Sequence, residues 1–328
     1  MSTYYQIFGG KINVVTSDPS NPIEGQVWYN TTSEVLKYSS TQEGAWASGG
    51  NMSNSRTEFG GCGTQTAALA IGGYSGTTHL SAAEEYDGTS WTSGGSLNTA
   101  RQGLGAAGTQ TTAAAFGGSP DGSAITGATE EYDGTSWTNS GSLGTSRELL
   151  TGAGTQTSAL AFGGRPPPAT TTATEEYDGS SWTGGGSLTN ARFYPGGSGT
   201  QTSAAAFGGT APPVGRLANT EEYDGSSWTS GGTMATARTT FGAGTQTAAL
   251  AFGGSATPGP TGATESYNGT SWTSVASMST ARANHSGASA GTQTSTAAFG
   301  GQITAGITNI TEEFTGGPTA VTKTVTGS

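Results

Sequence analysis

The stretch Gly108-Thr109-Gln110-Thr111 is one of six identical copies of a tetrapeptide, and their regular spacing indicates the fold. The steps between successive copies are 45, 46, 45, 45 and 47 residues. The copies begin at Gly63, Gly108, Gly154, Gly199, Gly244 and Gly291. A period of this length is that of one four-stranded blade of a β-propeller. We therefore expect a large all-β domain made of repeated four-stranded units, with almost no helix.

Each copy stands among the same landmarks. An arginine precedes it and an Ala-rich run ending in a glycine doublet follows it; in the first five copies a Tyr and a Trp five positions apart come last, whereas the sixth has Glu312-Glu313-Phe314 and no following Trp. Asp-Gly and two small polar residues separate that Tyr and Trp, which predicts a tight hairpin with Gly at positive φ. We assign structural roles to the repeated Arg and Trp, which are Arg56, Arg101, Arg147, Arg192, Arg238 and Arg282, and Trp46, Trp91, Trp137, Trp182, Trp228 and Trp272.

This order of landmarks resembles the Kelch repeat of β-propellers, over about residues 26 to 326. The resemblance implies a Kelch-type propeller of six or seven four-stranded blades, with the ring closed by strands from both termini. With six blades, Trp46 completes the last repeat; with seven, the slightly favoured alternative, residues 26–48 form most of an extra blade. The expected organisation is an attachment segment (1–25) and a propeller (26–328), the latter comprising closing strands (26–56), six repeats (57–318) and a closing strand (319–328).

Composition narrows the class of partner. The net charge is −11, and six of the eleven Lys and Arg residues are the repeat arginines, which argues against a nucleic-acid partner. Cys62 is the only cysteine, so no intramolecular disulfide forms. We find no basic start followed by an apolar run and no membrane-spanning stretch, so we expect synthesis in the cytoplasm without ordinary secretion or membrane insertion.

Paired carboxylates raise the question of catalysis. Neighbouring side chains on a strand point to opposite faces, so a pair such as Glu84-Glu85 cannot act as one dyad. We expect one Glu of each pair to bind a repeat Arg across a blade boundary while the other is solvated; calcium binding is the alternative. His79 and His285 occupy non-equivalent positions of the repeat. We therefore expect no metal site, no cofactor and no enzymatic activity, with a carbohydrate-active propeller enzyme as a remote alternative.

A second resemblance lies near the amino terminus, in the run from Asn21 to Asn30 (Asn-Pro-Ile-Glu-Gly-Gln-Val-Trp-Tyr-Asn) and in Val35-Leu36-Lys37-Tyr38. These residues are similar to a short hairpin module of bacteriophage tail-fibre and other virion proteins. Repeats with Glu-Glu-Tyr-Asp-Gly-Thr-Ser-Trp are similar to those of proteins from marine phages, particularly phages of cyanobacteria. The resemblance implies a non-enzymatic virion protein that lysis releases, either a tail-fibre or tail-associated component that contacts the host surface or a capsid or tail decoration or assembly protein. Implied partners are other virion proteins, a host-surface glycan or protein, and further copies of the chain.

The parts that differ between repeats are the candidate binding regions. The loops after the glycine doublets vary in length, proline content and charge, at 74–80, 119–125, 165–170, 210–217, 255–261 and 302–307. Residues just after the repeat arginines also vary, as in Phe193-Tyr194 and Asn284-His285, and we expect them at the channel or its mouth. Equivalent loops of a propeller share one face, and relaxed drift is the alternative explanation of their variation. The candidate ligand-binding residues are Tyr74, His79, Arg165, Pro166, Pro167 and Arg216.

Overall fold

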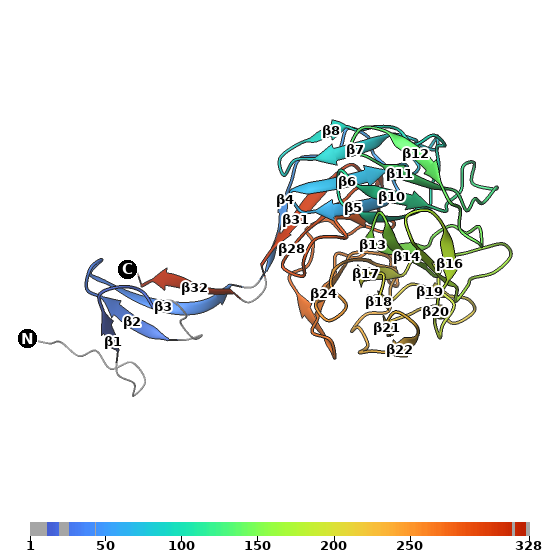
Figure 1. The fold of residues 1–328 in the computed structure, drawn as a ribbon. Helices are drawn as coiled ribbons and strands as arrows, with labels where there is room; N and C mark the ends of the chain where they lie inside the picture. Colours follow the sequence, from blue (N-terminus) through green and yellow to red (C-terminus); the bar gives the residue numbers. More distant parts are fainter. Residues whose placement is uncertain (1–11, 20–25, 43, 317–318, 326–328) are drawn as a thin grey trace, which may run out of the picture. The chain divides into compact units, whose positions relative to one another are not determined.

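The computed structural model describes residues 12–19, 26–42, 44–316 and 319–325, and within them every regular element is a β-strand. The chain divides into two compact units. Unit 1 comprises Met1–Gly44 and Gly316–Ser328, and unit 2 comprises Ala45–Thr315. Figure 1 shows the strands of both units. The all-β class expected from the sequence is confirmed.

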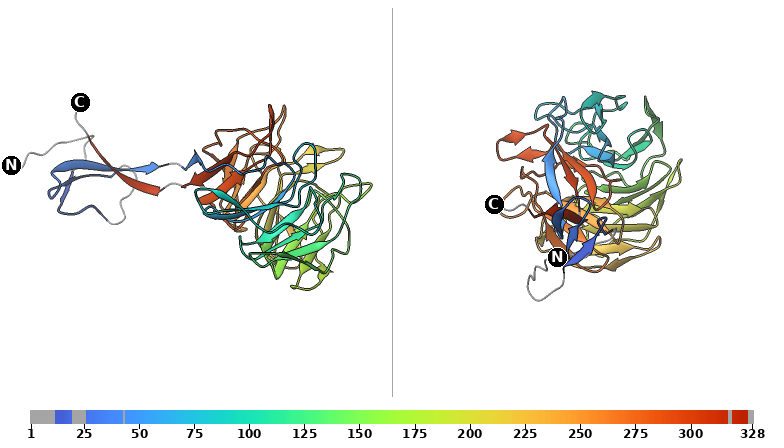
Figure 2. Two further views of the ribbon diagram at one scale, coloured as in Figure 1. Left: turned by 90° about the horizontal axis from the view of Figure 1, so that it is seen from above. Right: turned by 90° about the vertical axis from the view of Figure 1, so that its left-hand side faces the viewer.

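Unit 2 is built from four-stranded antiparallel sheets, one for each sequence repeat, in a propeller-like arrangement (Figures 1 and 2). The first sheet contains β5 (Gly60–Thr64), β6 (Ala67–Ile71), β7 (Ala83–Tyr86) and β8 (Trp91–Ser93), and the second contains β9 (Gly105–Gly108), β10 (Ala113–Phe116), β11 (Thr129–Tyr132) and β12 (Trp137–Ser140). The third sheet contains β13 (Thr151–Thr155), β14 (Ser158–Phe162), β15 (Thr174–Tyr177) and β16 (Trp182–Gly184), and the fourth contains β17 (Gly196–Thr200), β18 (Ser203–Phe207), β21 (Thr220–Tyr223) and β22 (Trp228–Ser230). The fifth sheet contains β23 (Phe241–Gly244), β24 (Ala249–Phe252), β25 (Thr264–Tyr267) and β26 (Trp272–Val275), and the sixth contains β27 (Ser286–Gly287), β28 (Ser295–Phe299), β31 (Thr311–Thr315) and β4 (Ala45–Ser48). Two short hairpins, β19 (Thr210–Ala211) with β20 (Gly215–Arg216) and β29 (Gln302–Ile303) with β30 (Gly306–Ile307), lie in the variable loops.

The hairpin predicted between Tyr and Trp is confirmed in each sheet that carries both residues. In the first sheet, Tyr86 pairs with Trp91 across a turn in which Gly88 has φ of 89°. The Asp87 carboxylate accepts the backbone N–H groups of Thr89 (2.8 Å) and Ser90 (2.7 Å). Asp suits this position because its short carboxylate side chain accepts the backbone N–H groups of its own turn.

The contacts between neighbouring sheets follow the first strand of each. Strands β5, β9, β13, β17, β23 and β27 contact one another in that cyclic order, with β27 returning to β5. These strands are rich in Gly because their backbones approach closely: a Cβ built on Gly242 would lie 2.4 Å from Cζ of Phe207 and 2.5 Å from the Gly197 carbonyl oxygen. The Ala-rich run forms the second strand, and the Gly-rich stretch before it makes the closest approach between sheets.

The apolar core lies between neighbouring sheets. One cluster combines Leu69 and Ile71 of the first sheet with Ala113, Tyr132 and Trp137 of the second. Equivalent clusters recur at the next boundaries. Small side chains on the second strand and large aromatic side chains on the outer strands therefore fill a space that widens outward, as propeller packing requires.

The two termini contribute differently from the favoured expectation. Strand β4 completes the sheet of the last repeat, where Trp46 pairs with Phe314, as the six-blade alternative stated. Strand β2 (Val27–Asn30) instead pairs with β3 (Val35–Gln42), and β3 pairs with β32 (Thr319–Thr324), in unit 1. The boundary between the two units lies at residue 44, not at 25, because β3 uses its free edge to pair with the carboxy-terminal strand rather than with the repeats.

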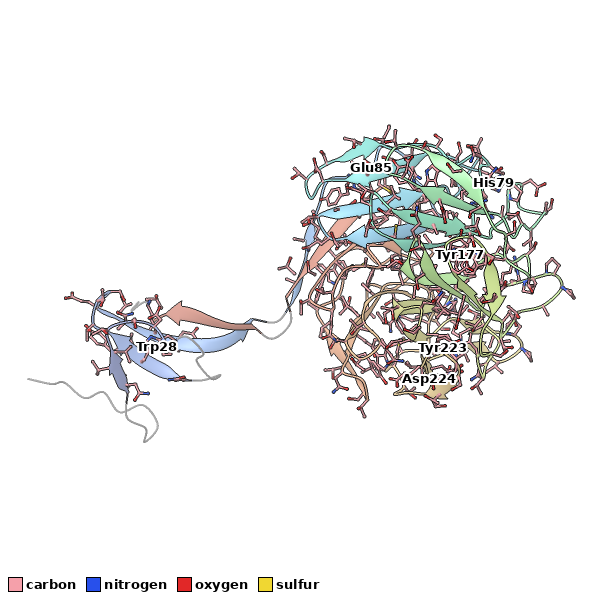
Figure 3. The ribbon with its side chains drawn as sticks, viewed as in Figure 1. Trp28, His79, Glu85, Tyr177, Tyr223 and Asp224 are labelled. Atoms are coloured by element: carbon pink, nitrogen blue, oxygen red, sulfur yellow. The ribbon has the colours of Figure 1, made fainter. Side chains whose placement is uncertain are left out.

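Unit 1 is a four-stranded sheet in the order β1 (Asn13–Val15), β2, β3, β32, in which β1 runs parallel to β2. Trp28 is fully buried, and its indole N–H donates to Asp18 Oδ1 (3.0 Å); Figure 3 labels this residue. Asp18 also accepts from Asn30 (2.7 Å) and pairs with Lys37 (2.7 Å), and these partners lower its pKa to about 2. Most of the expected attachment segment 1–25 lies outside the described residues.

The division into units predicts the outcome of two truncations. The fragment 45–315 retains β4 and should unfold cooperatively, with a Tm within about 4 °C of the full chain. The fragment 49–315 loses Trp46 and exposes the edge of β31, so we expect it to aggregate or to lose more than about 10 °C in Tm. Calorimetry and size-exclusion chromatography of both fragments measure this, and equal stability of the two would refute the placement of β4.

Candidate functional site

Every repeat arginine of unit 2 has a fully buried side chain that pairs with the first Glu of its own repeat. Arg56 Nη2 lies 2.5 Å from Glu84 Oε1, and its Nη1 donates to the Gly72 (3.0 Å) and Ala82 (2.7 Å) carbonyls. Burial opposes ionisation of Glu84, but Arg56 and the donated N–H groups outweigh it and lower the pKa of this carboxyl. Breaking such a pair from one side is strongly destabilising, so these arginines are structural. We expected the pair to cross a blade boundary, but it joins the segment that precedes the first strand to the third strand of the same sheet.

The second Glu of each pair joins neighbouring sheets. Its carboxylate accepts the hydroxyl of the Tyr in the following repeat, so it is not merely solvated. The bonds are Tyr132 to Glu85 (2.6 Å), Tyr177 to Glu131 (2.7 Å), Tyr223 to Glu176 (2.6 Å), Tyr267 to Glu222 (2.7 Å) and Tyr86 to Glu313 (2.5 Å). Figure 3 labels Glu85, Tyr177 and Tyr223 of this series. Burial and the adjacent carboxylate raise the pKa of Tyr132 to about 12, so its hydroxyl stays protonated and donates.

One boundary lacks this bond, and both of its partners are changed together. The fifth repeat has Ser266 where the others have the second Glu, and the sixth has Phe314 where the others have Tyr. Phe314 is buried against Trp46, with ring centroids 5.2 Å apart. A Glu at position 266 would face Phe314, which has no hydroxyl to donate a hydrogen bond to the carboxylate. The two exceptional residues therefore correspond to one missing hydrogen bond between sheets.

Two further repeat residues fasten each sheet to the one before it. The amide of the Gln in Gly-Thr-Gln-Thr donates to backbone carbonyls of the preceding sheet, as Gln110 does to Ala68 (3.1 Å) and Tyr86 (2.6 Å). The Trp indole N–H donates to a Thr hydroxyl of the preceding sheet in five repeats. Trp137 donates to the Gly95 carbonyl instead, since Ala83 replaces that Thr. The decisive sequence motifs are therefore contacts that hold the sheets together.

A double-mutant cycle tests the bond between sheets. We expect Tyr132→Phe and Glu85→Ser each to cost about 1 to 3 kcal/mol, since each leaves a partly buried group without its partner. The double variant reproduces the natural Phe and Ser combination and should cost less than the sum, by about 1 kcal/mol or more. Urea unfolding measures all three.

The matched control combines Tyr132→Phe with Glu176→Ser, whose carboxylate accepts from Tyr223 at another boundary. These two changes should add, because residues without shared partners do not couple. Additivity in the Tyr132 and Glu85 cycle itself would contradict a direct bond.

The hairpin aspartates predict a contribution to acid stability. Bonds from Ser226 and Ser227 lower the pKa of Asp224 from 3.8 to about 2. Its contribution is therefore present above pH 3.8 and is lost as the pH falls through about 2. The fifth repeat carries Asn268 at this position, and its Oδ1 accepts the same two N–H bonds (3.0 and 2.9 Å) without a charge.

A variant with Asn at both Asp178 and Asp224 should keep its hairpins and lose less stability than wild type between pH 3.8 and about 2. Urea midpoints at the two pH values measure the difference. An unchanged pH dependence would show that these carboxylates do not contribute.

The candidate binding residues lie in the loops beside the inner strands. Tyr74 and His79 contact each other, with ring centroids 5.2 Å apart, and line a hollow of about 460 Å³. Glu58 and Asp121 share this hollow. Figure 3 labels His79. His285 lies elsewhere, buried between Phe241 and Phe252, and burial lowers its pKa to about 3; the two histidines are not brought together.

The other candidate binding residues differ in whether they bind a carboxylate of the chain and whether they line a hollow. Arg165 donates to Glu148 (2.6 Å) and lies 5.8 Å above the Phe193 ring, so its charge is already compensated. Pro166 and Pro167 follow it and line none of the described hollows. Arg216 on β20 is exposed and lines a second hollow of about 410 Å³.

Residues two positions after five of the repeat arginines form an incomplete ring of backbone hydrogen bonds around one hollow. They adopt positive φ, at Glu58 (54°), Gly103 (64°), Leu149 (56°), Tyr194 (52°) and Asn284 (49°). Four of the five N–H groups donate to the carbonyl of the preceding member: Glu58 to Asn284 (3.0 Å), Gly103 to Glu58 (2.6 Å), Leu149 to Gly103 (2.6 Å) and Tyr194 to Leu149 (2.9 Å). Non-glycine residues rarely adopt this conformation, and such positions concentrate at functional sites. Tyr194 and Asn284 both line the hollow that these residues surround, and we call this opening the channel mouth.

The ring is interrupted in the fifth repeat. Three positions separate Arg238 from Phe241, the first residue of β23, whereas four separate the equivalent residues of each other repeat, such as Arg56 and Gly60. The missing residue is the one that elsewhere has positive φ. Within the described part of the chain, the Tyr194 carbonyl and the Asn284 N–H have no hydrogen-bond partner. The hollow that contains Arg216 lies at this interruption, between Tyr194, Thr239 and Asn284.

Comparisons with known proteins leave the family open: no protein-family model matches the chain, and no curated protein matches it significantly. Among the described residues, no three His, Cys, Asp or Glu side chains gather closely enough to hold a metal ion. The same residues include no helix of the length and apolar character that would cross a bilayer.

Proposed function

We propose that this chain is a non-enzymatic bacteriophage virion protein, a tail-fibre or tail-associated component that recognises the host surface through the mouth of a six-bladed propeller. The support for a closed ring of six blades is the cyclic contact of the first strands and the bond from Tyr86 to Glu313, which joins the first and last repeats. The sequence resemblances to Kelch repeats and to virion hairpin modules support the class.

One observation carries the recognition role. The repeated charged and aromatic groups fasten the sheets to one another, whereas the unrepeated ones gather beside the channel mouth. Glu58, Tyr74 and His79 line one hollow there, and Phe193 and Arg216 line the other. A rigid scaffold with divergent loops at one opening suits recognition, because the loops change without loss of the fold.

Particle-level experiments test this proposal. Antibodies against the chain should label the tail of intact particles in electron micrographs. Replacing residues 210–217 by a Gly/Ser linker should keep assembly and lower adsorption to host cells by about tenfold, since several weak contacts share the binding. The matched control is Thr183→Ala with Thr229→Ala, two exposed residues of the outer strands.

Label distributed over the capsid, with unchanged adsorption of the loop variant, would instead support the decoration role. Particles without any label would overturn both roles.

A further inference from the structure

We propose that the interruption of the backbone ring in the fifth repeat is a binding site for a sugar that bears a carboxylate. The inference deepens the proposed recognition role and gives it a ligand class. It starts from the hollow of about 410 Å³ that Phe193, Tyr194, Thr210, Gly215, Arg216, Thr239, Ser255 and Asn284 line. A hollow of this size is within the range of small-molecule sites, about 300 to 1,000 Å³.

The charge of the site comes from Arg216. Unit 2 contains no lysine, and seven of its eight arginines pair with carboxylates, which leaves Arg216 as the one without such a partner. Its guanidinium donates to two hydroxyls of the next loop, Ser255 (2.7 Å) and Thr257 (3.3 Å), which hold it in place. A planar guanidinium binds a carboxylate through two parallel hydrogen bonds.

The unpaired backbone groups supply the polar contacts of a sugar. In the other repeats a residue of positive φ would use the Tyr194 carbonyl and the Asn284 N–H, but here both remain without a partner. One acceptor and one donor beside the same hollow match the hydroxyl groups of a sugar ring. Unpaired polar backbone groups are costly where water is excluded, so a ligand that pairs them gains affinity.

The residues around the hollow favour a ligand with a single negative charge and a sugar ring. The half-buried side chains of Phe193 and Tyr194, with ring centroids 5.7 Å apart, give the wall an apolar surface for the C–H face of a sugar. The Tyr194 hydroxyl is buried near Glu58, and burial together with that carboxylate raises the pKa of Tyr194 well above its ordinary value. A doubly charged phosphate would meet the Glu58 and Glu148 carboxylates at the same mouth, which disfavours it relative to a carboxylate.

Binding of simple ligands to the purified full chain tests the site without the particle. The probes are D-glucuronate, D-glucose and acetate, titrated to about 50 mM and followed by calorimetry or ligand-observed NMR. We expect saturable binding of glucuronate with a Kd in the low millimolar range, at least about tenfold tighter than either glucose or acetate. Equal binding of glucose would overturn the carboxylate assignment, equal binding of acetate would overturn the sugar assignment, and no saturable glucuronate binding would overturn the site.

Three variants locate the binding. Arg216→Gln should reduce glucuronate affinity to that of glucose, and Arg216→Lys should recover only part of it. Insertion of one Gly between Thr239 and Thr240 restores the four-position spacing, and we expect it to close the ring and abolish binding while Tm is retained. The control is the double variant Thr183→Ala with Thr229→Ala, two exposed residues of the outer strands, which should change affinity less than about twofold.

Retention of binding by both the Arg216→Gln and the Gly-insertion variants would overturn the location. Because these measurements use isolated protein, their failure is separate from failure of the virion role. Glucuronate binding together with unlabelled particles would retain the site and reject the virion role.

Discussion

The hydrogen bond from a tyrosine hydroxyl to the second glutamate of the preceding repeat is the contact on which the arrangement of unit 2 depends. It joins neighbouring sheets directly through two side chains, and it recurs at five boundaries, including that between the first and last repeats. The buried Arg and Glu pair acts within one sheet, so the two glutamates of each pair have separate roles. Alternation of side chains along a strand makes this division possible.

This division explains why a chain with only 32% hydrophobic residues folds around so little aliphatic core. The boundary between the second and third sheets, for example, combines an aromatic contact between Phe116 and Trp182 (4.8 Å) with directed bonds from a Gln, a Trp and a Tyr. Buried polar groups stabilise a structure only when they are satisfied, and here the repeat supplies their partners. The repeated motif residues are therefore structural, and the sequence differences between repeats are concentrated in the loops.

Much of the fold was predictable because its signals are local. The 45-residue period, the Asp-Gly turns and the structural role of the repeat arginines all follow from short stretches of sequence. The role of residues 26–42 was not predictable in this way, because the alternating sequence of a strand such as β3 does not indicate which strand it pairs with. The structure pairs β3 with β32, outside the repeats. Phe193 and Tyr194 were expected at the mouth from their variability. The hollow beside them depends on the shortened interval between Arg238 and Phe241, a signal present in the sequence that only a residue-by-residue alignment of the repeats reveals.

The most direct test installs the tyrosine and glutamate bond where it is absent. Ser266→Glu and Phe314→Tyr are made singly and together, and the free energy of unfolding is measured by urea denaturation. Each single change should destabilise, because it adds a partly buried polar group without a partner. The double variant should be more stable than the sum of the two predicts, by about 1 kcal/mol or more. Strict additivity would contradict the claim that this bond fastens neighbouring sheets.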